Sequence, residues 1–449
     1  MDWTIAIIIS AIGFALVALR STWLIDYAVL IFVLNRGLRR VIDYYINHDF
    51  NPLSPISLVT LAIGMAMTLR LIIEIPRLPA WAGRIFLCLF GAATYAFVVG
   101  FFHVQLAALY ALGETLSALA LMGYALLLNP SIRVRDRWVR SFAWGAIIAS
   151  TYGWYQYLTI PPWDAFWLVK VGFVGYMGIP EPTKMTCFST MAERGVLAGY
   201  LGFAVVPMIV SARWRTWLSW PAVLLVFSVI LLTGSRGGLM IAITATTVFV
   251  LVNHGAGGWQ MFLAIIIVGG TAWFGMDRLP NSDSIKERFG TLGKLEEDGS
   301  YEGRVDIMSG GIGASLRNPL GFGLGAVGLG TRVNSGGMQS SANFGDAGYF
   351  NVVLVYGLVG TALLVLGLYR GWKRLGLYYR VPELRSDHVL LARSLLVATL
   401  LCCWLGDVLT GFSIFWLALG CGLSVRREAL EEARWQREQR MLEWQTTAI

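Results

Sequence analysis

Charged side chains are scarce in this sequence. Asp, Glu, Lys and Arg make up 14% of its 449 residues, whereas soluble domains average about 25%. Histidine and cysteine are also few, at 4 and 5 residues, and they form neither the ligand spacing of a zinc site nor a disulfide framework. The composition excludes an ordinary soluble protein, and we expect no metal and no cofactor.

Apolar runs of about 15 to 23 residues recur along the chain, and 56% of all residues are hydrophobic. About 20 apolar residues suffice for a helix to cross the hydrocarbon core of a bilayer. The runs lack the alternation of membrane strands, and backbone groups in lipid must be paired within their own segment, so the runs predict helices. The expected fold class is all-α: a polytopic integral membrane protein of about 12–13 transmembrane helices with one large periplasmic loop.

Residues 1–424 form the expected single membrane domain, and 425–449 a cytoplasmic tail that is either an interfacial helix or a solvated segment. The first apolar run has no basic n-region and no small-residue cleavage site, so we interpret it as a retained span. The spans are expected near residues 3–19, 22–35, 56–73, 84–102, 107–128, 141–159, 195–211, 217–233, 238–252, 259–276, 347–369, 388–404 and 410–424.

The net charge of +8 comes mainly from arginine, which supplies 30 of the 35 basic residues. These arginines cluster in short segments between apolar runs, which is typical of cytoplasmic loops rather than of a nucleic-acid surface. Three clusters, Arg133–Arg140, Arg213–Arg215 and Arg370–Arg385, set the orientation. Counting spans from them places the loops 160–194 and 277–346 outside.

The first hundred residues fit this count less well. Thirteen spans place the N-terminus and the basic segment Arg36-Gly-Leu-Arg-Arg40 outside, against the usual charge bias. Either one short N-terminal run does not cross, or this basic segment faces outward for a functional reason. The sequence leaves both alternatives open.

A pair of opposite charges occurs at the end of one expected span. Arg70 and Glu74 are four residues apart, a spacing that places their side chains on one helix face. Charges inside apolar runs are costly unless they are paired or functional. We therefore expect a local ion pair between these two residues.

The stretch from Asp277 to Asp346 stands apart, because its roughly seventy residues contain no membrane-length apolar run. Arg304 lies at its centre, where it either pairs with a neighbouring carboxylate such as Glu302 or binds a ligand. Asp346 ends the stretch and can cap the helix that follows, since Asp is favoured there. Capping does not exclude a chemical role.

Two glycine-rich motifs face the same side on this topology. In Thr233-Gly-Ser-Arg-Gly-Gly238, backbone amides and the planar fork of Arg236 can converge on a phosphate; the alternative is a simple turn with an arginine reaching the interface. The motif Asn318-Pro-Leu-Gly-Phe-Gly-Leu-Gly325 lacks the following Lys-Ser/Thr of a P-loop. Its glycines favour close packing on the membrane surface or on a ligand.

These motifs resemble the O-antigen ligase and polymerase family of bacterial membrane proteins. The likeness covers roughly residues 180–425 and includes the order of the parts: apolar spans, the arginine turn, two more spans, one large outer loop and a few closing spans. The motifs that carry it are Ser235-Arg-Gly-Gly238, Arg304 followed by Asn318-Pro-Leu-Gly-Phe-Gly323, Asp346 followed by Tyr349 and Gly357-Leu-Val-Gly360, and Phe188-Ser-Thr-Met191 with Ala198, which is similar to exopolysaccharide repeat-unit polymerases.

The resemblance implies a metal-independent, inverting glycosyltransferase of the bacterial inner membrane. Its donor would be an undecaprenyl-diphosphate-linked glycan on the periplasmic face. Arg236 and Arg304 would hold the diphosphate and neutralise charge on the leaving group, with Arg194 as a further candidate. An acceptor hydroxyl would attack the anomeric carbon with help from a base.

One departure from the family concerns that base. The ligase branch typically has a histidine followed by asparagine where this chain has Asp346-Ala347. The missing histidine weakens a ligase assignment and makes Asp346 a candidate base or acceptor-orienting group. Glu193 and Glu302 are the other catalytic candidates.

The expected function is polymerisation of lipid-linked repeat units into exopolysaccharide. One alternative is an O-antigen-type ligase that transfers glycan to another acceptor. The other is a lipid-linked-glycan transporter or flippase, a class that tends to show internal repeats and broken helices; no repeat is evident in the sequence. Expected partners are the lipid-linked glycan, the bilayer, a flippase and chain-length regulator proteins, and no nucleic acid.

Overall fold

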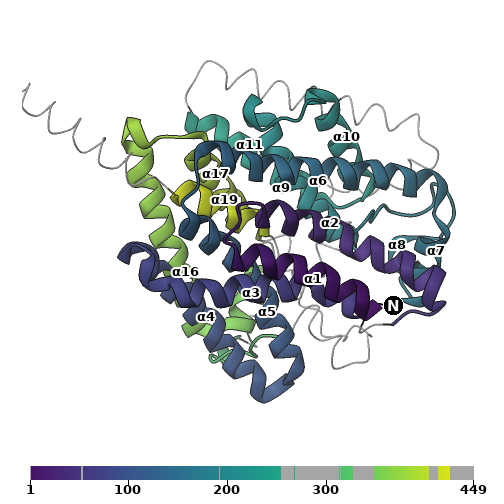
Figure 1. The fold of residues 1–449 in the computed structure, drawn as a ribbon, viewed down its shortest axis with the longest axis horizontal. Helices are drawn as coiled ribbons and strands as arrows, with labels where there is room; N and C mark the ends of the chain where they lie inside the picture. Colours follow the sequence, from purple (N-terminus) through teal and green to yellow (C-terminus); the bar gives the residue numbers. More distant parts are fainter. Residues whose placement is uncertain are drawn as a thin grey trace, which may run out of the picture.

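The computed structural model describes residues 2–51, 54–191, 193–253, 315–326, 348–403 and 413–424, with 267, 270 and 313 as isolated positions. These parts contain fourteen α-helices and no sheet (Figure 1), which confirms the all-α prediction for the described residues. The helices are α1 (Asp2–Ala18), α2 (Leu24–Ile42), α3 (Val59–Glu74), α4 (Ala80–Val104), α5 (Leu106–Leu128), α6 (Ile132–Thr159), α7 (Pro162–Lys170), α8 (Val174–Met177), α9 (Arg194–Val210), α10 (Ser219–Leu232), α11 (Arg236–Asn253), α16 (Gly348–Arg380), α17 (Asp387–Cys402) and α19 (Ser413–Leu423).

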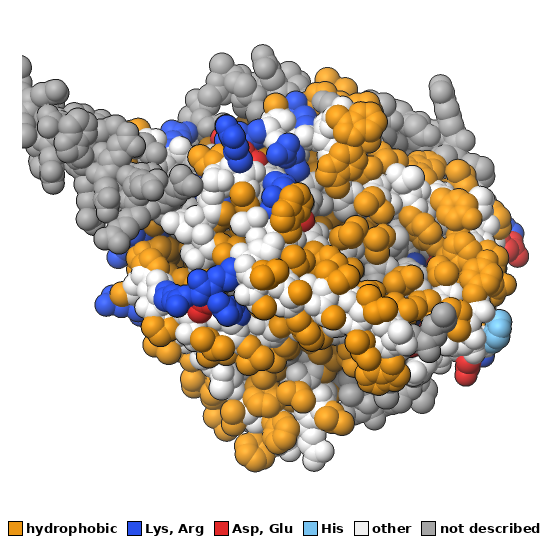
Figure 2. Space-filling view, viewed as in Figure 1, with side chains coloured by type: hydrophobic (Ala, Val, Ile, Leu, Met, Phe, Trp, Pro, Cys, Tyr) orange, Lys and Arg blue, Asp and Glu red, His pale blue; other side chains and the backbone are white. Residues whose placement is uncertain are grey.

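Four helical segments are long and apolar enough to cross a membrane: Pro55–Arg77, Ala80–Val104, Leu106–Leu128 and Gly348–Arg380. Large apolar side chains on their surfaces are exposed, and much of the molecular face in Figure 2 is hydrophobic. Monomeric soluble proteins rarely expose contiguous apolar surface of this kind. These features indicate a membrane protein, and the four segments match expected spans.

The three arginine clusters expected on one side meet at one end of the bundle. Asp136 Oδ1 accepts hydrogen bonds from Trp214 Nε1 at 2.8 Å and pairs with His388 Nε2 at 3.0 Å. Arg135 Nη1 donates to the carbonyl of Ser424 at 2.6 Å, which brings the end of α19 to the same place. We call this the basic end, comprising residues 20–26, 74–77, 129–140, 211–216, 380–388 and 424.

Lys and Arg side chains gather at the left and at the upper centre of the face shown in Figure 2. The expected local pair forms at the basic end, since Arg70 binds Glu74. The same carboxylate also pairs with Arg20 at 2.7 Å and Arg77 at 3.0 Å. One acidic side chain thus joins the turn after α1 to the end of α3.

The opposite end of the bundle carries the N-terminus, α7 and α8, at the right of Figure 1. Asn47 donates to Asp2 Oδ2 at 3.0 Å, and Arg40 pairs with Asp164 at 2.7 Å. We call this the loop end, comprising residues 2, 40–51, 54–57, 160–191, 193 and 233–236. The basic segment 36–40 lies on α2 and leads to the loop end. Both N-terminal alternatives stay predictions.

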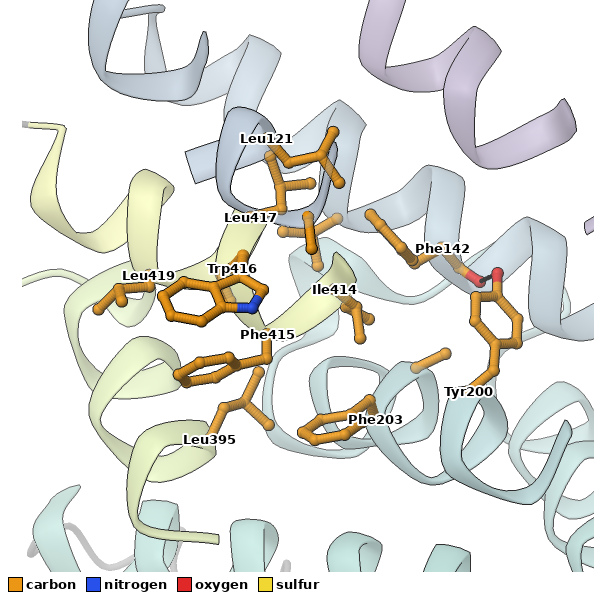
Figure 3. Packing of buried hydrophobic residues seen from close by; sticks show 14 of the residues in the cluster. Leu121, Phe142, Tyr200, Phe203, Leu395, Ile414, Phe415, Trp416, Leu417 and Leu419 are labelled. Atoms are coloured by element: carbon orange, nitrogen blue, oxygen red, sulfur yellow. Dashed lines mark hydrogen bonds between the residues drawn. The ribbon is translucent and has the colours of Figure 1, made fainter. Parts of the chain in front are cut away.

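The core between the two ends is continuous and apolar. In Figure 3, Phe415, Trp416 and Leu417 of α19 lie among side chains from neighbouring helices, and all three are buried. Tyr200 of α9 donates its hydroxyl hydrogen to the carbonyl of Phe142 of α6 at 3.0 Å (Figure 3). Buried polar groups are stabilised when paired in this way, so α6 and α9 are held in register.

Candidate functional site at the loop end

Arg194 and Arg236 begin two helices that run in the same direction. Helix α9 starts at Arg194 and α11 starts at Arg236, both at the loop end. Their backbones are in direct contact, because a Cβ atom on Gly238 would overlap the carbonyl oxygen of Ala198. Unpaired amide groups and the positive end of a helix dipole occur at each helix N-terminus. Two guanidinium groups and two helix N-termini therefore lie on neighbouring helices at one end.

The side chain of Arg194 is held by an aromatic ring. Its guanidinium carbon lies 4.0 Å from the centroid of the Tyr176 ring in α8, an arrangement in which the ring attracts the cation. Its Nη1 atom is buried and has no hydrogen-bond partner among the described residues. Stacking fixes the guanidinium while leaving a donor available.

Glu193 precedes Arg194 at the N-cap position of α9. Its backbone is extended, with φ −154° and ψ 143°, and its side chain makes no capping hydrogen bond. Asp and Glu side chains near a helix N-terminus are favoured electrostatically. The structure thus places a predicted catalytic candidate and a predicted diphosphate-binding candidate side by side on the chain, at the loop end.

The turn before Arg236 is fixed by hydrogen bonds within the chain. Thr233 Oγ1 donates to the carbonyl of Ile230 at 2.6 Å and accepts from the amide of Ser235 at 3.1 Å. Gly234 has φ +61°, a conformation that favours glycine. Arg236 is partly buried and lies in the first turn of α11, not in the turn between the helices.

A buried arginine that the sequence analysis did not assign to a site organises the neighbouring loop. Arg40 pairs with Asp164 at 2.7 Å, donates from Nη1 to the carbonyl of Met191 at 2.6 Å, and donates from Nη2 to the carbonyl of Ser189. Arg40 and Asp164 are each 1% exposed. A buried charge pair requires such additional hydrogen bonds to offset its desolvation.

The other oxygen of Asp164 extends this network. It accepts hydrogen bonds from Tyr152 at 2.8 Å and from Gln156 Nε2 at 2.6 Å. Gln156 Oε1 in turn accepts from the amides of Phe188 at 3.0 Å and Ser189 at 2.7 Å. The segment 187–191, which precedes Glu193 and Arg194, is therefore fixed to α2 and α6.

One sequence signal could have led to Arg40. On the expected topology its segment lies outside, against the usual charge bias, and a basic residue placed there calls for a binding partner. The partner could not be identified in this way, because Asp164 lies 124 residues away.

The glycine segment, residues 318–325, packs into an interruption of helix α16. Gly357 has φ +59° and ψ −174°, which breaks the helix. The carbonyls freed at Leu354 and Val355 accept hydrogen bonds from the amides of Phe322 at 2.7 Å and Gly323 at 3.1 Å. The amide of Leu358 donates to the carbonyl of Pro319 at 2.9 Å.

The other side of the glycine segment contacts α4. The amide of Leu324 donates to the carbonyl of Ala96 at 2.8 Å, and the hydroxyl of Tyr95 donates to the carbonyl of Leu320 at 3.1 Å. A Cβ atom on Gly323 would overlap the amide nitrogen of Gly100. The glycine segment packs closely, but the expected surface was wrong: it packs on the backbone of α4 and α16 and not on the membrane surface or a ligand.

Three of the predicted site residues, Arg304, Glu302 and Asp346, lie outside the described residues. Their roles stay predictions. The helix expected after Asp346 is α16, described from Gly348 onwards. Within the described part of the chain, no group of three or more His, Cys, Asp or Glu side chains could hold a metal ion.

Comparison of the chain with protein-family models, curated proteins and solved structures gives no match. The likeness to the O-antigen ligase and polymerase family accordingly rests on the short motifs and their order. The structure brings Glu193, Arg194 and Arg236 to one end of the bundle.

Proposed function

We propose that this chain is a membrane-embedded glycosyltransferase that polymerises undecaprenyl-diphosphate-linked oligosaccharide units into exopolysaccharide. The observation that carries the proposal is the placement of Arg194 and Arg236 at the starts of two touching, parallel helices at the loop end. Guanidinium forks bind phosphate oxygens in pairs, and helix N-termini favour anions. A lipid-linked diphosphate has the charge and the oxygen geometry that such a site recognises.

The proposed reaction transfers the growing glycan from its carrier lipid to the sugar end of an incoming unit. A bond forms between an acceptor hydroxyl oxygen and the anomeric carbon, while the bond from that carbon to the diphosphate oxygen breaks. The hydroxyl proton passes to a carboxylate, for which Asp346, Glu193 and Glu302 are the candidates. Arg194, Arg236 and Arg304 stabilise the negative charge on the departing diphosphate. In this scheme no metal ion is needed.

The proposed topology places the loop end in the periplasm and the basic end in the cytoplasm of a bacterial inner membrane. Four described helical segments are long and apolar enough to cross a membrane, and shorter apolar helices accompany them. The sequence predicts a further span near 259–276. The arginine clusters at the basic end support this orientation. On this topology the basic segment 36–40 lies outside, where Arg40 pairs with Asp164.

The interrupted helix α16 bears on the transporter alternative. Broken helices in transporters present unwound backbone groups to substrate or ions. Here the carbonyls of Leu354 and Val355 and the amide of Leu358 are paired with the glycine segment. The interruption is filled by the chain itself, so it supports a packing role and does not favour transport.

Carrier-lipid and glycan analysis in a strain deleted for this chain tests the proposal. Accumulation of a single lipid-linked repeat unit, reversed by the wild-type chain, is the expected result. Long polymer retained on the carrier lipid would instead identify a ligase. Accumulation of lipid-linked units on the cytoplasmic face would identify a flippase and overturn the proposal.

A further inference from the structure

A cavity of about 320 Å³ opens at the basic end, between the end of α16 and the start of α17. This volume lies within the range of about 300–1,000 Å³ that is typical of small-molecule sites. The cavity is far along the bundle from Arg194 and Arg236, which begin at the loop end. Its lining residues are Tyr379, Arg380, Pro382, Arg385, Ser386, Asp387 and Leu390.

Arginines surround one aromatic ring of this cavity. The guanidinium carbons of Arg385 and Arg393 each lie 4.7 Å from the centroid of the Tyr379 ring. Arg393 also stacks over Trp372 at 4.4 Å, and its Nε atom is buried with no hydrogen-bond partner among the described residues. Stacking on aromatic faces holds these cations in place. The guanidinium of Arg385, which lines the cavity, is therefore held against the Tyr379 ring, and that of Arg393 contacts the same ring.

The one carboxylate known to line the cavity is already engaged. Asp387 Oδ2 accepts a hydrogen bond from Ser211 at 3.2 Å and lies 3.9 Å from Nε of Arg213. Arg213 thereby adds a fourth arginine to the group formed by Arg380, Arg385 and Arg393. Among the described side chains around the cavity, positive charge is in clear excess.

Arginines that serve only to orient the chain in the membrane need neither a cavity nor stacking on aromatic rings. We propose that this cavity binds a phosphate group, supplied by the headgroup of an anionic phospholipid in the leaflet at the basic end. Basic pockets between helices at a membrane surface recognise such headgroups, and arginine forks match phosphate oxygens in pairs. Tyr379 and Trp372 belong to the aromatic residues that favour the membrane interface. This proposal does not depend on glycosyl transfer.

Lipid titration of the purified full-length chain tests the proposal. Short-chain phosphatidylglycerol is titrated into the detergent-solubilised protein, and the rise of the thermal unfolding midpoint gives an apparent affinity. Phosphatidylcholine of the same chain length and inorganic phosphate are titrated in parallel. The wild-type chain is expected to respond to phosphatidylglycerol and not to phosphatidylcholine.

The site variant is Arg380→Gln with Arg385→Gln, and the matched control is Arg133→Gln with Arg140→Gln. All four arginines are exposed, and both pairs remove the same charge. The site pair is expected to weaken phosphatidylglycerol binding about tenfold, with little change in the control pair. Arg380→Gln alone, at an exposed position, provides a second variant if the double substitution does not fold.

Two results would overturn the proposal: an equal loss of affinity in both pairs, which would indicate charge attraction only, and no response of the wild-type chain to either phosphate-bearing ligand. Saturation by inorganic phosphate with an affinity equal to that of the lipid would support the phosphate site and assign it to the free anion. A response to the lipid alone would assign it to the headgroup.

Discussion

Arg40 and Arg194 lie at the same end of the bundle and are held in different ways. Each nitrogen of the Arg40 guanidinium has an acceptor: the Asp164 carboxylate and the carbonyls of Met191 and Ser189. Arg194 rests on the ring of Tyr176, and its Nη1 has no acceptor among the described residues. An arginine whose donors are used by the protein has a structural role. An arginine fixed by a ring keeps donors for a ligand.

The loop end therefore contains one arginine that stabilises the fold and one that can bind a ligand. Arg40, with Asp164 and Gln156, fixes the segment 187–191. That segment leads directly to Arg194. Arg40, whose guanidinium nitrogens all have acceptors, therefore positions Arg194, whose Nη1 is available to a ligand. Stability and ligand binding should therefore respond to different substitutions.

The largest expected effect is on folding. Arg40→Ala leaves the Asp164 carboxylate buried without its cation, and loss of one partner of a buried pair costs about 3–5 kcal/mol. We expect little folded protein in the membrane and a strongly lowered unfolding midpoint in detergent. Replacing both residues by apolar ones, Arg40→Met with Asp164→Leu, should recover part of the loss. Wild-type stability of Arg40→Ala would contradict a structural role.

The next effect concerns the proposed base. Asn caps a helix about as well as Asp, but it cannot take a proton from a hydroxyl. If Asp346 is the base, Asp346→Asn should lose about two to four orders of magnitude in polymerisation rate, with normal protein levels. Assay of purified protein with a lipid-linked donor checks this. An active Asn variant would remove Asp346 from the catalytic candidates and direct attention to Glu193 and Glu302.

Substitution of the diphosphate-binding candidates should cost activity and spare folding, which is the reverse of Arg40. Arg236→Ala and Arg304→Ala are each expected to lower the rate by about two to three orders of magnitude. Arg→Lys at either position should rescue poorly, because a point charge does not reproduce the bidentate fork. Polymer length in complemented cells, measured beside protein level, checks both. Full activity of both alanine variants would exclude these roles.

A smaller effect is expected at the glycine segment. Gly323→Ala would place a methyl group against the backbone of Gly100 at a φ of +82°, and overpacking costs about 1–3 kcal/mol. Gly376→Ala is the matched control, since a Cβ there meets nothing within 4 Å. Unfolding midpoints of the two variants in detergent compare them directly. Equal midpoints would mean that the close approach of the segment to α4 is dispensable.

How far the sequence predicts this structure depends on how many residues separate the interacting side chains along the chain. The Arg70–Glu74 pair follows from a spacing of four on one helix and is present. The clustering of Arg135, Arg213 and Arg385 at one end follows from charge bias. The Arg40–Asp164 pair has no local pattern, and its partners are brought together only by packing of α2 against α7.

The glycine segment illustrates the same limit. Its three glycines predict close backbone approach, and Gly321, Gly323 and Gly325 all have positive φ. The break at Gly357 was not predicted, because a single glycine in an apolar run is compatible with an unbroken helix. It is stabilised by hydrogen bonds from residues more than thirty positions earlier in the chain. Such pairing is a property of the fold rather than of either segment.

Binding of undecaprenyl diphosphate to the purified full-length chain tests the central claim most directly. Arg194→Gln with Arg236→Gln should weaken binding by about a hundredfold or more, because two charge-assisted contacts to the diphosphate are lost. Arg133→Gln with Arg140→Gln removes the same charge at the basic end and should leave the affinity nearly unchanged. Equal affinities for the wild-type chain and the Arg194, Arg236 double variant would contradict the claim that these residues hold the diphosphate.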